Sequence, residues 1–213
     1  MVTHPRSMSK KDRRLESERM IMMAAEKVFA EAGFGGATMQ LIADVAGLPK
    51  ANLHYYFPTK EALYRRVVQD IFQVWLKAAD IFDQASGPVE GIGAYIDAKM
   101  EISRRHPAGS KVWASEVMHG APVIQDYLET TLEQWTNSRI SVIQSWIDRG
   151  LMAPLDPRHL LYMVWATTQH YADFGHQIET LNKGEPLTDA QWRAATDNVK
   201  TIILKGIGAK LVP

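Results

Sequence analysis

Residues 34–63 read FGGATMQLIADVAGLPKANLHYYFPTKEAL and contain two short helical segments joined by a glycine turn. The hydroxyl of Thr38 can accept hydrogen bonds from the free amides at the start of a helix over about 38–46. Gly47 can adopt the positive φ of a sharp turn, and Pro49 opens a second helix, ending near Tyr56, with its φ already set. Two short helices joined by such a turn predict a helix-turn-helix.

The rest of the chain is also predicted to form helices. A helix from about Leu15 to Ala32, closed by Gly33, precedes the helix-turn-helix, because its apolar residues recur at helical spacing. A long helix over about 59–84 follows it, and glycine and proline separate the later segments. No stretch alternates with the period of two that a strand requires. We therefore expect an all-α fold of nine helices, the last five over 89–105, 111–119, 123–149, 157–181 and 189–208.

Composition limits the classes of site that the chain can hold. It has 213 residues, of which 46% are hydrophobic and 23% charged, as in a globular protein with a buried core. It contains no cysteine, which excludes disulfides, thiolate metal ligands and cysteine nucleophiles. No stretch approaches the roughly 18 apolar residues of a membrane span, and the first residues lack the apolar core of a signal peptide. We expect a soluble, cytoplasmic protein without a membrane partner.

Charge is unevenly distributed although the net charge is zero. Residues 1–66 hold 11 lysines and arginines against 7 acidic residues. Subtracting these from the totals of 24 and 24 leaves 13 basic against 17 acidic residues in the remainder. A basic front and an acidic back are expected if only the front faces phosphates. A difference of this size also arises by chance, so it supports DNA binding only weakly.

The run quoted above resembles the DNA-binding domain of TetR-family repressors, through its turn glycine at Gly47, the aromatic cluster at 55–57 and the closing lysine at Lys60. The resemblance implies a homodimer that binds double-stranded DNA at a pseudo-palindromic operator and whose operator affinity a small-molecule effector lowers. It also implies a flexible basic arm over 1–14, a DNA-binding domain over 15–60 and a ligand-binding and dimerisation domain over 61–213. No cofactor is expected.

A recognition helix places its N-terminal residues near base edges. Lysine can donate to guanine, asparagine can pair with adenine, and an alanine methyl can meet a thymine methyl. The family usually has serine or threonine where Pro49 stands, and many members have tyrosine at His54, so the family's base contacts cannot be copied directly. The residues expected at bases are Lys50, Ala51, Asn52, His54 and Gln40, and those expected at phosphates are Thr38, Tyr55, Tyr56 and Lys60.

The resemblance extends beyond the DNA-binding domain, most clearly in the run WATTQHYADF at 165–174. There the chain is similar to a member of the family that regulates pyrimidine use, and that similarity implies uracil or thymine as effector and Trp75, Trp165 and Gln169 as pocket residues. Trp165 and Gln169 lie four residues apart and so share a helix face. An indole face and a primary amide suit a flat ring with adjacent C=O and N–H groups. For each residue alone, a purely structural role remains open.

The last predicted helix carries an apolar stripe at i, i+3, i+4, i+7 and i+8. In a single domain such a stripe faces the core, whereas in TetR-family proteins the last two helices pack against a second subunit. We therefore expect a dimer interface formed by Val199, Ile202, Ile203, Gly206 and Ile207.

Three alternatives remain at this point. The chain could be a TetR-type regulator of an unrelated ligand, or an architectural DNA-binding protein without an effector. An enzyme acting on pyrimidines is disfavoured, because the common nucleophile, phosphate and metal motifs are missing. His170, Asp173 and His176 could suggest a metal site, but three ligands within seven helical residues converge poorly. We expect no catalytic residues and no metal.

Overall fold

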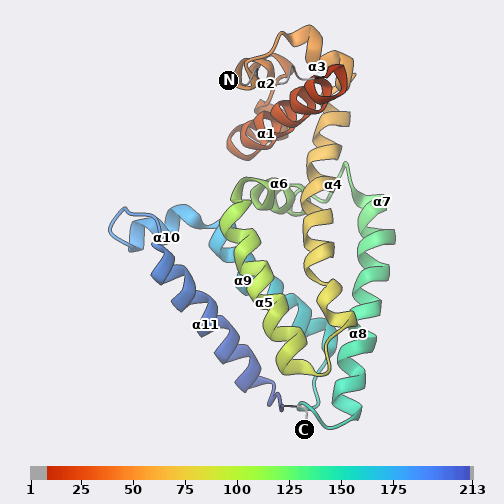
Figure 1. Cartoon of the computed structure of the whole chain (residues 1–213), viewed down its shortest axis with the longest axis vertical. Helices are drawn as coiled ribbons and strands as arrows, with labels where there is room; N and C mark the ends of the chain where they lie inside the picture. The colour runs from red at the N-terminus through yellow and green to blue at the C-terminus, as the bar shows by residue number, and fades with distance from the viewer. Residues whose placement is uncertain (1–8, 212–213) are drawn as a thin grey trace, which may run out of the picture. The chain divides into compact units, whose positions relative to one another are not determined.

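A computed structural model describes residues 9–211, and over that range the chain contains helices and no strands. The predicted all-α class is confirmed. The chain divides into two compact units between Gln69 and Asp70, a boundary that lies inside helix α4 rather than at its start. The two units are therefore described one at a time (Figure 1).

The first unit begins with α1 (Lys10–Gly36), which starts five residues before the predicted position. Ser9 and Asp12 form a capping box: the Asp12 amide donates to Ser9 Oγ at 3.1 Å, and the Ser9 amide donates to the Asp12 carboxylate at 3.1 Å. Residues 10–14 are therefore helical, which corrects the arm predicted over 1–14. Residues 1–8 of that arm lie outside the described residues.

The N-terminal unit continues with α2 (Met39–Ala46), α3 (Lys50–Tyr56) and the first part of α4 (Lys60–Ala78). Gly33 interrupts α1 with a φ of 66°, and Gly47 ends α2 with a φ of 66°, so both predicted glycine positions are confirmed. The rings of Phe29 and Phe34 each meet the Tyr64 ring edge-on, with centroids 4.9 Å apart. The core of this unit includes Ile21, Ala25, Val28, Phe29, Ile42, Ala43, Leu53, Leu63 and Val67.

The second unit starts with the end of α4, which stops at Ala78 instead of continuing to about residue 84. A 3-10 helix follows over Asp80–Asp83. Arg139 explains this geometry, because its guanidinium donates to the Ala79 carbonyl at 3.2 Å and to both carboxylate oxygens of Asp83 at 2.7 and 3.2 Å. A guanidinium held in this way fixes the chain direction after the helix.

Seven further α segments complete this unit: α5 (Pro88–Arg105), α6 (Pro107–Met118), α7 (Gln125–Tyr127), α8 (Glu133–Asp148), α9 (Pro157–Asp173), α10 (Gly175–Leu181) and α11 (Asp189–Gly206). A π-helical stretch, Leu128–Leu132, joins α7 to α8, so 125–148 is one helix, close to the predicted 123–149. The predicted helix over 157–181 is divided at Phe174, directly before Gly175, where helix propensity is low. The described chain thus holds ten helices where nine were predicted.

Helix α5 contacts α6, α9 and α11 (Figure 1). Its residues Ile92, Tyr95, Ile96 and Met100 are buried together with Trp146 of α8. A Cβ at Gly91 would lie 2.5 Å from the Trp146 ring, so only glycine allows α5 to approach α8 this closely.

The apolar stripe of α11 has two different environments. Val199, Ile203 and Ile207 are buried in the core of their own chain, which corrects their predicted place in a dimer interface. A side chain enclosed by its own domain offers no surface to a second subunit. Only Ile202, which is 62% exposed, and Gly206 face outward among the residues of this stripe.

Among the described residues, no helix is long and apolar enough to cross a lipid bilayer.

Candidate functional site

Two regions gather the residues expected to bind partners, one in each unit. The first is the helix-turn-helix formed by α2 and α3. Thr38 caps α2 by accepting a hydrogen bond from the Leu41 amide at 3.1 Å, as predicted. Pro49 precedes α3 without a side-chain cap, so the α3 amides at this end are left without that partner.

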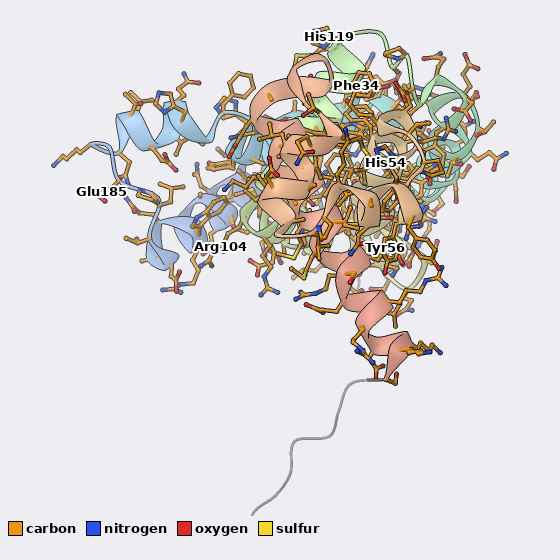
Figure 2. All side chains as sticks on the ribbon, turned by 90° about the horizontal axis from the view of Figure 1, so that it is seen from above. Phe34, His54, Tyr56, Arg104, His119 and Glu185 are labelled. Carbon is orange, nitrogen blue, oxygen red and sulfur yellow. The ribbon has the colours of Figure 1, made fainter. Side chains whose placement is uncertain are left out.

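Helix α3 is anchored by one buried side chain, Leu53, and presents its other side chains outward. The predicted base-reading residues Lys50, Ala51, Asn52 and His54 are all exposed. Tyr55 is 72% exposed, and its ring meets the half-buried Tyr56 ring edge-on at 5.2 Å. Figure 2 labels His54 and Tyr56 on this surface. A short helix with one apolar anchor and an otherwise exposed face has the form of a recognition helix.

Two of the predicted DNA contacts also have partners within the protein. Gln40 is exposed, and its amide donates to Asp44 one turn later at 2.8 Å. The Lys60 ammonium donates to the carbonyls of Phe34 and Ala37 at 2.7 and 3.0 Å and lies 4.3 Å from the Phe34 ring centroid. Two of the three N–H bonds of Lys60 therefore hold the end of α1 and the residue that follows it, and the third has no hydrogen-bond partner among the described residues.

The second region is a cavity of about 190 Å³ in the C-terminal unit. It is lined by Trp75 of α4 and by Trp165 and Gln169 of α9, so the three predicted ligand residues lie around one space. The cavity is smaller than the roughly 300–1,000 Å³ of sites for drug-sized ligands. Its size and aromatic walls suit a small, flat molecule.

Hydrogen bonds and ring contacts fix the orientation of the aromatic walls. The Trp165 indole donates to the Tyr95 hydroxyl at 2.9 Å, and the Trp165 ring lies 6.0 Å from that of Trp135. Burial raises the pKa of Tyr95 far above its ordinary value, so this phenol stays neutral. The indole N–H of Trp165 is therefore used within the protein and is not free for a ligand.

Lys99 is a cavity residue that the sequence analysis did not single out. It is 2% exposed, and its ammonium nitrogen lies 4.2 Å from the centroid of the Trp75 ring. Burial lowers the pKa of Lys99 to about 7, and the negative charge of Asp173 opposes this shift. A signal was present in the sequence, because Lys99 follows the apolar residues Ile92 and Ile96 at helical spacing and so lies on the same face of the helix.

Asp173 links α9 to α6. Its carboxylate accepts a hydrogen bond from the Ser110 hydroxyl at 2.6 Å. Burial raises the pKa of Asp173, while the Ser110 hydrogen bond and the charge of Lys99 lower it. His170 and His176 are exposed, and no metal-binding cluster of three or more His, Asp or Glu side chains occurs in residues 9–211.

The chain is similar to known proteins along most of its length. Residues 21–67 match the family described as bacterial regulatory proteins of the tetR family, and residues 68–210 match the C-terminal region of YcdC-like proteins. The transcriptional regulator RutR of Escherichia coli K12 is 38% identical over 190 residues, which cover 89% of this chain and 90% of RutR. The repressor KstR2 of Mycobacterium tuberculosis H37Rv is 26% identical over 163 residues, which cover 73% of this chain and 81% of KstR2.

Solved structures show the same fold. The ketosteroid regulator KstR2 of Mycobacterium tuberculosis superposes with a TM-score of 0.68 at 23% identity, covering 95% of this chain and 98% of that one. The regulator PfmR of Thermus thermophilus gives a TM-score of 0.71 at 14% identity, covering 91% and 99%.

This chain belongs to the TetR family of transcriptional regulators. It is a DNA-binding regulator of the kind that small molecules control, and its relatives are regulators rather than enzymes. The alternatives of an architectural protein and of a pyrimidine-acting enzyme are thereby set aside.

The buried Lys99 predicts a specific dependence of stability on pH. Because its pKa falls on folding, the unfolded chain holds more protons between pH 7 and about 10, and the free energy of unfolding from this group rises with pH across that window. The rise is at most about 1.4 kcal/mol per pH unit. Urea unfolding of wild type and Lys99→Met at pH 7, 8 and 9 measures this effect. The free energy of unfolding of wild type, relative to that of the variant, should increase with pH.

The control for this measurement is Lys111→Met, because Lys111 is an exposed lysine that also acts on Asp173. It should keep the pH dependence of wild type. If Lys99→Met and wild type respond to pH alike, Lys99 is not the titrating group.

Proposed function

We propose that this chain is a homodimeric repressor whose operator affinity falls when a small, flat ligand of the pyrimidine class fills the cavity. The observation that carries the proposal is that Trp75 lines one cavity of about 190 Å³ together with Trp165 and Gln169, which are distant from it in sequence. Two indole rings can contact the faces of a planar ring, and the amide of Gln169 offers both donors and an acceptor. The resemblance to a regulator of pyrimidine use supports the same class of ligand.

Helix α4 provides the physical connection that control requires. It runs from Lys60, which holds the turn before α2, to beyond Trp75, which lines the cavity. A ligand that prefers the arrangement unable to bind DNA would lower operator affinity, and DNA would weaken the ligand by the same factor. Such couplings are typically about 1–3 kcal/mol.

The effector role of Gln169 is tested by Gln169→Leu, which keeps much of the volume and removes the amide. The variant should bind the operator like wild type but require far more ligand for release, because the polar edge of the ligand loses its partner. Operator release is measured by fluorescence anisotropy during titration with uracil and thymine. Release of the variant at the wild-type ligand concentration would place the polar recognition elsewhere.

We propose that α3 reads the operator with Lys50, Ala51, Asn52 and His54, and that Asn52 reads one base pair in each half-site. Asn52→Ala should relax discrimination at that pair by about 1–3 kcal/mol. Selection of bound duplexes from a random pool, followed by affinities for single-base variants, measures the effect. The exposed Lys27→Ala on α1 serves as control. An unchanged specificity profile for Asn52→Ala would exclude this docking face.

We propose that the second subunit packs on the outward faces of α9 and α11. These faces carry apolar side chains without cover in the single chain, among them Ile202 at 62% and Met163 at 48% exposed. Ile202→Asp should shift the chain towards monomers, because dimerisation would bury an unpaired charge. Sedimentation velocity measures this, and circular dichroism should show an unchanged fold.

A substitution at the neighbouring position distinguishes loss of the dimer from loss of the fold. Ile203→Asp places a charge in the core of the single chain and should unfold it, since Ile203 is 4% exposed. Dimers of normal stability with Ile202→Asp would move the interface to another face.

A further inference from the structure

We propose that Lys99 anchors the effector: the ligand presents an edge of oxygen acceptors to the Lys99 amine, and the complex forms with this amine protonated. The inference rests on the proposed function and specifies the ligand chemistry that the cavity selects. It follows from the hydrogen-bond donors and acceptors of the residues that line the cavity.

The cavity holds more hydrogen-bond donors than acceptors. Lys99 Nζ has no hydrogen-bond or ion-pair partner among the described residues, and its only close polar contact is the face of the Trp75 ring. The Trp135 indole nitrogen is also without a partner, but it is fully enclosed and so offers no contact to a molecule in the cavity. Gln169 adds two donors and one acceptor, and none of the cavity-lining residues carries a carboxylate.

An unpartnered amine of this kind indicates the chemistry of the group that it would bind. A buried donor without a partner costs free energy, and a buried ammonium costs more. An oxygen acceptor placed at the Lys99 amine would remove this cost. A planar ring with carbonyl oxygens, or one with a carboxylate, offers such an edge, whereas a ring that turns an amino group towards Lys99 would oppose donor to donor.

The charged side chains of the neighbouring helices α9 and α6 do not contact the Lys99 amine directly. On α9, Asp173 acts on Lys99 from a distance, but its carboxylate is held by Ser110, and His170 next to it is exposed. On α6, the buried Glu116 accepts a hydrogen bond from the Val123 amide at 2.7 Å, and Lys111 is exposed.

The other packed elements also have their charges engaged. On α11, Lys200 donates to Asp97 of α5 at 2.6 Å. On α8, Arg139 pairs with Asp83. α4 contributes the Trp75 ring beside Lys99. No described carboxylate therefore contacts the Lys99 amine directly, and the effector's oxygen is the group that completes its environment.

Protonation follows from this arrangement. Burial lowers the pKa of Lys99 to about 7, so at pH 8 most of the free protein carries a neutral amine. An oxygen acceptor, and above all a carboxylate, stabilises the charged form and raises this pKa. Binding at pH 8 therefore takes up about one proton, and affinity falls as pH rises above 7, by at most about tenfold per unit.

The experiment is isothermal titration calorimetry of the full chain at pH 7 and 8, each in phosphate and in Tris, whose ionisation heats differ. Uracil and orotate are the probes, because they share the ring and differ by a carboxylate. Cytosine, with an amino group in place of one carbonyl, is the negative control. We expect proton uptake with the probe that binds, and binding of cytosine at least about tenfold weaker. Tighter binding of orotate would identify the carboxylate as the anchor, and tighter binding of uracil the ring carbonyl.

Variants assign the effect to Lys99. Lys99→Met should lower the affinity for the probe that binds by about ten- to a hundredfold, which is the contribution of a hydrogen bond to a charged group. Lys99→Gln keeps a donor without a charge, so it should weaken binding less and abolish proton uptake. Lys111→Met, a matched change at an exposed lysine of α6, should bind like wild type.

Several results would overturn the proposal: no proton uptake by wild type, undiminished binding by Lys99→Met, or no binding of either probe. If Lys99→Met does not fold, binding by Lys99→Gln and the proton uptake of wild type still show whether Lys99 is the anchor. Operator binding in the absence of ligand does not depend on these results, so failure of the anchor and failure of the repressor function are distinguishable.

Discussion

The C-terminal unit depends on the close packing of α5 against its neighbours. Trp146 of α8 lies so near α5 that Gly91 has no room for a side chain, and Phe82 stacks on the same indole with centroids 5.8 Å apart. Helices α6, α9 and α11 contact α5 as well, so α5 has little free surface. A lysine on its inner face cannot reach solvent, and Lys99 is therefore enclosed with its ammonium group against Trp75.

This packing also explains which polar groups near the cavity have a hydrogen-bond partner within the protein and which do not. Trp165 is held by Tyr95, and Asp173 by Ser110, so these groups stabilise the contacts among α5, α6 and α9. The Lys99 amine, by contrast, forms no hydrogen bond to another helix among the described residues and lies against the Trp75 ring. Groups left unsatisfied in an otherwise well-paired interior are expected at functional sites. The same helix thus sets both the rigidity of the domain and the chemistry of its ligand.

The sequence predicted local features well where one residue type has few alternatives. Thr38 and Gly47 could be placed because capping and positive φ restrict the choice of residue. Helical spacing paired Trp165 with Gln169, but only the resemblance joined Trp75 to them, since no pattern in a single sequence joins α4 to α9. Lys99 was missed because a lysine is usually solvated, and its burial depends on how α6 and α9 pack over α5.

The stripe on α11 shows the limit of periodicity. An apolar stripe predicts that one face is covered, but it does not say whether the cover is the same chain or a second copy. Here Val199 and Ile203 pack inward on the domain core, whereas Ile202, one position away from Ile203 and therefore rotated by about 100°, faces outward. A helix of this kind can serve two surfaces at once, so the residues that hold the domain together and those available for dimerisation alternate along α11. Substitutions at adjacent positions are accordingly the way to separate folding from assembly.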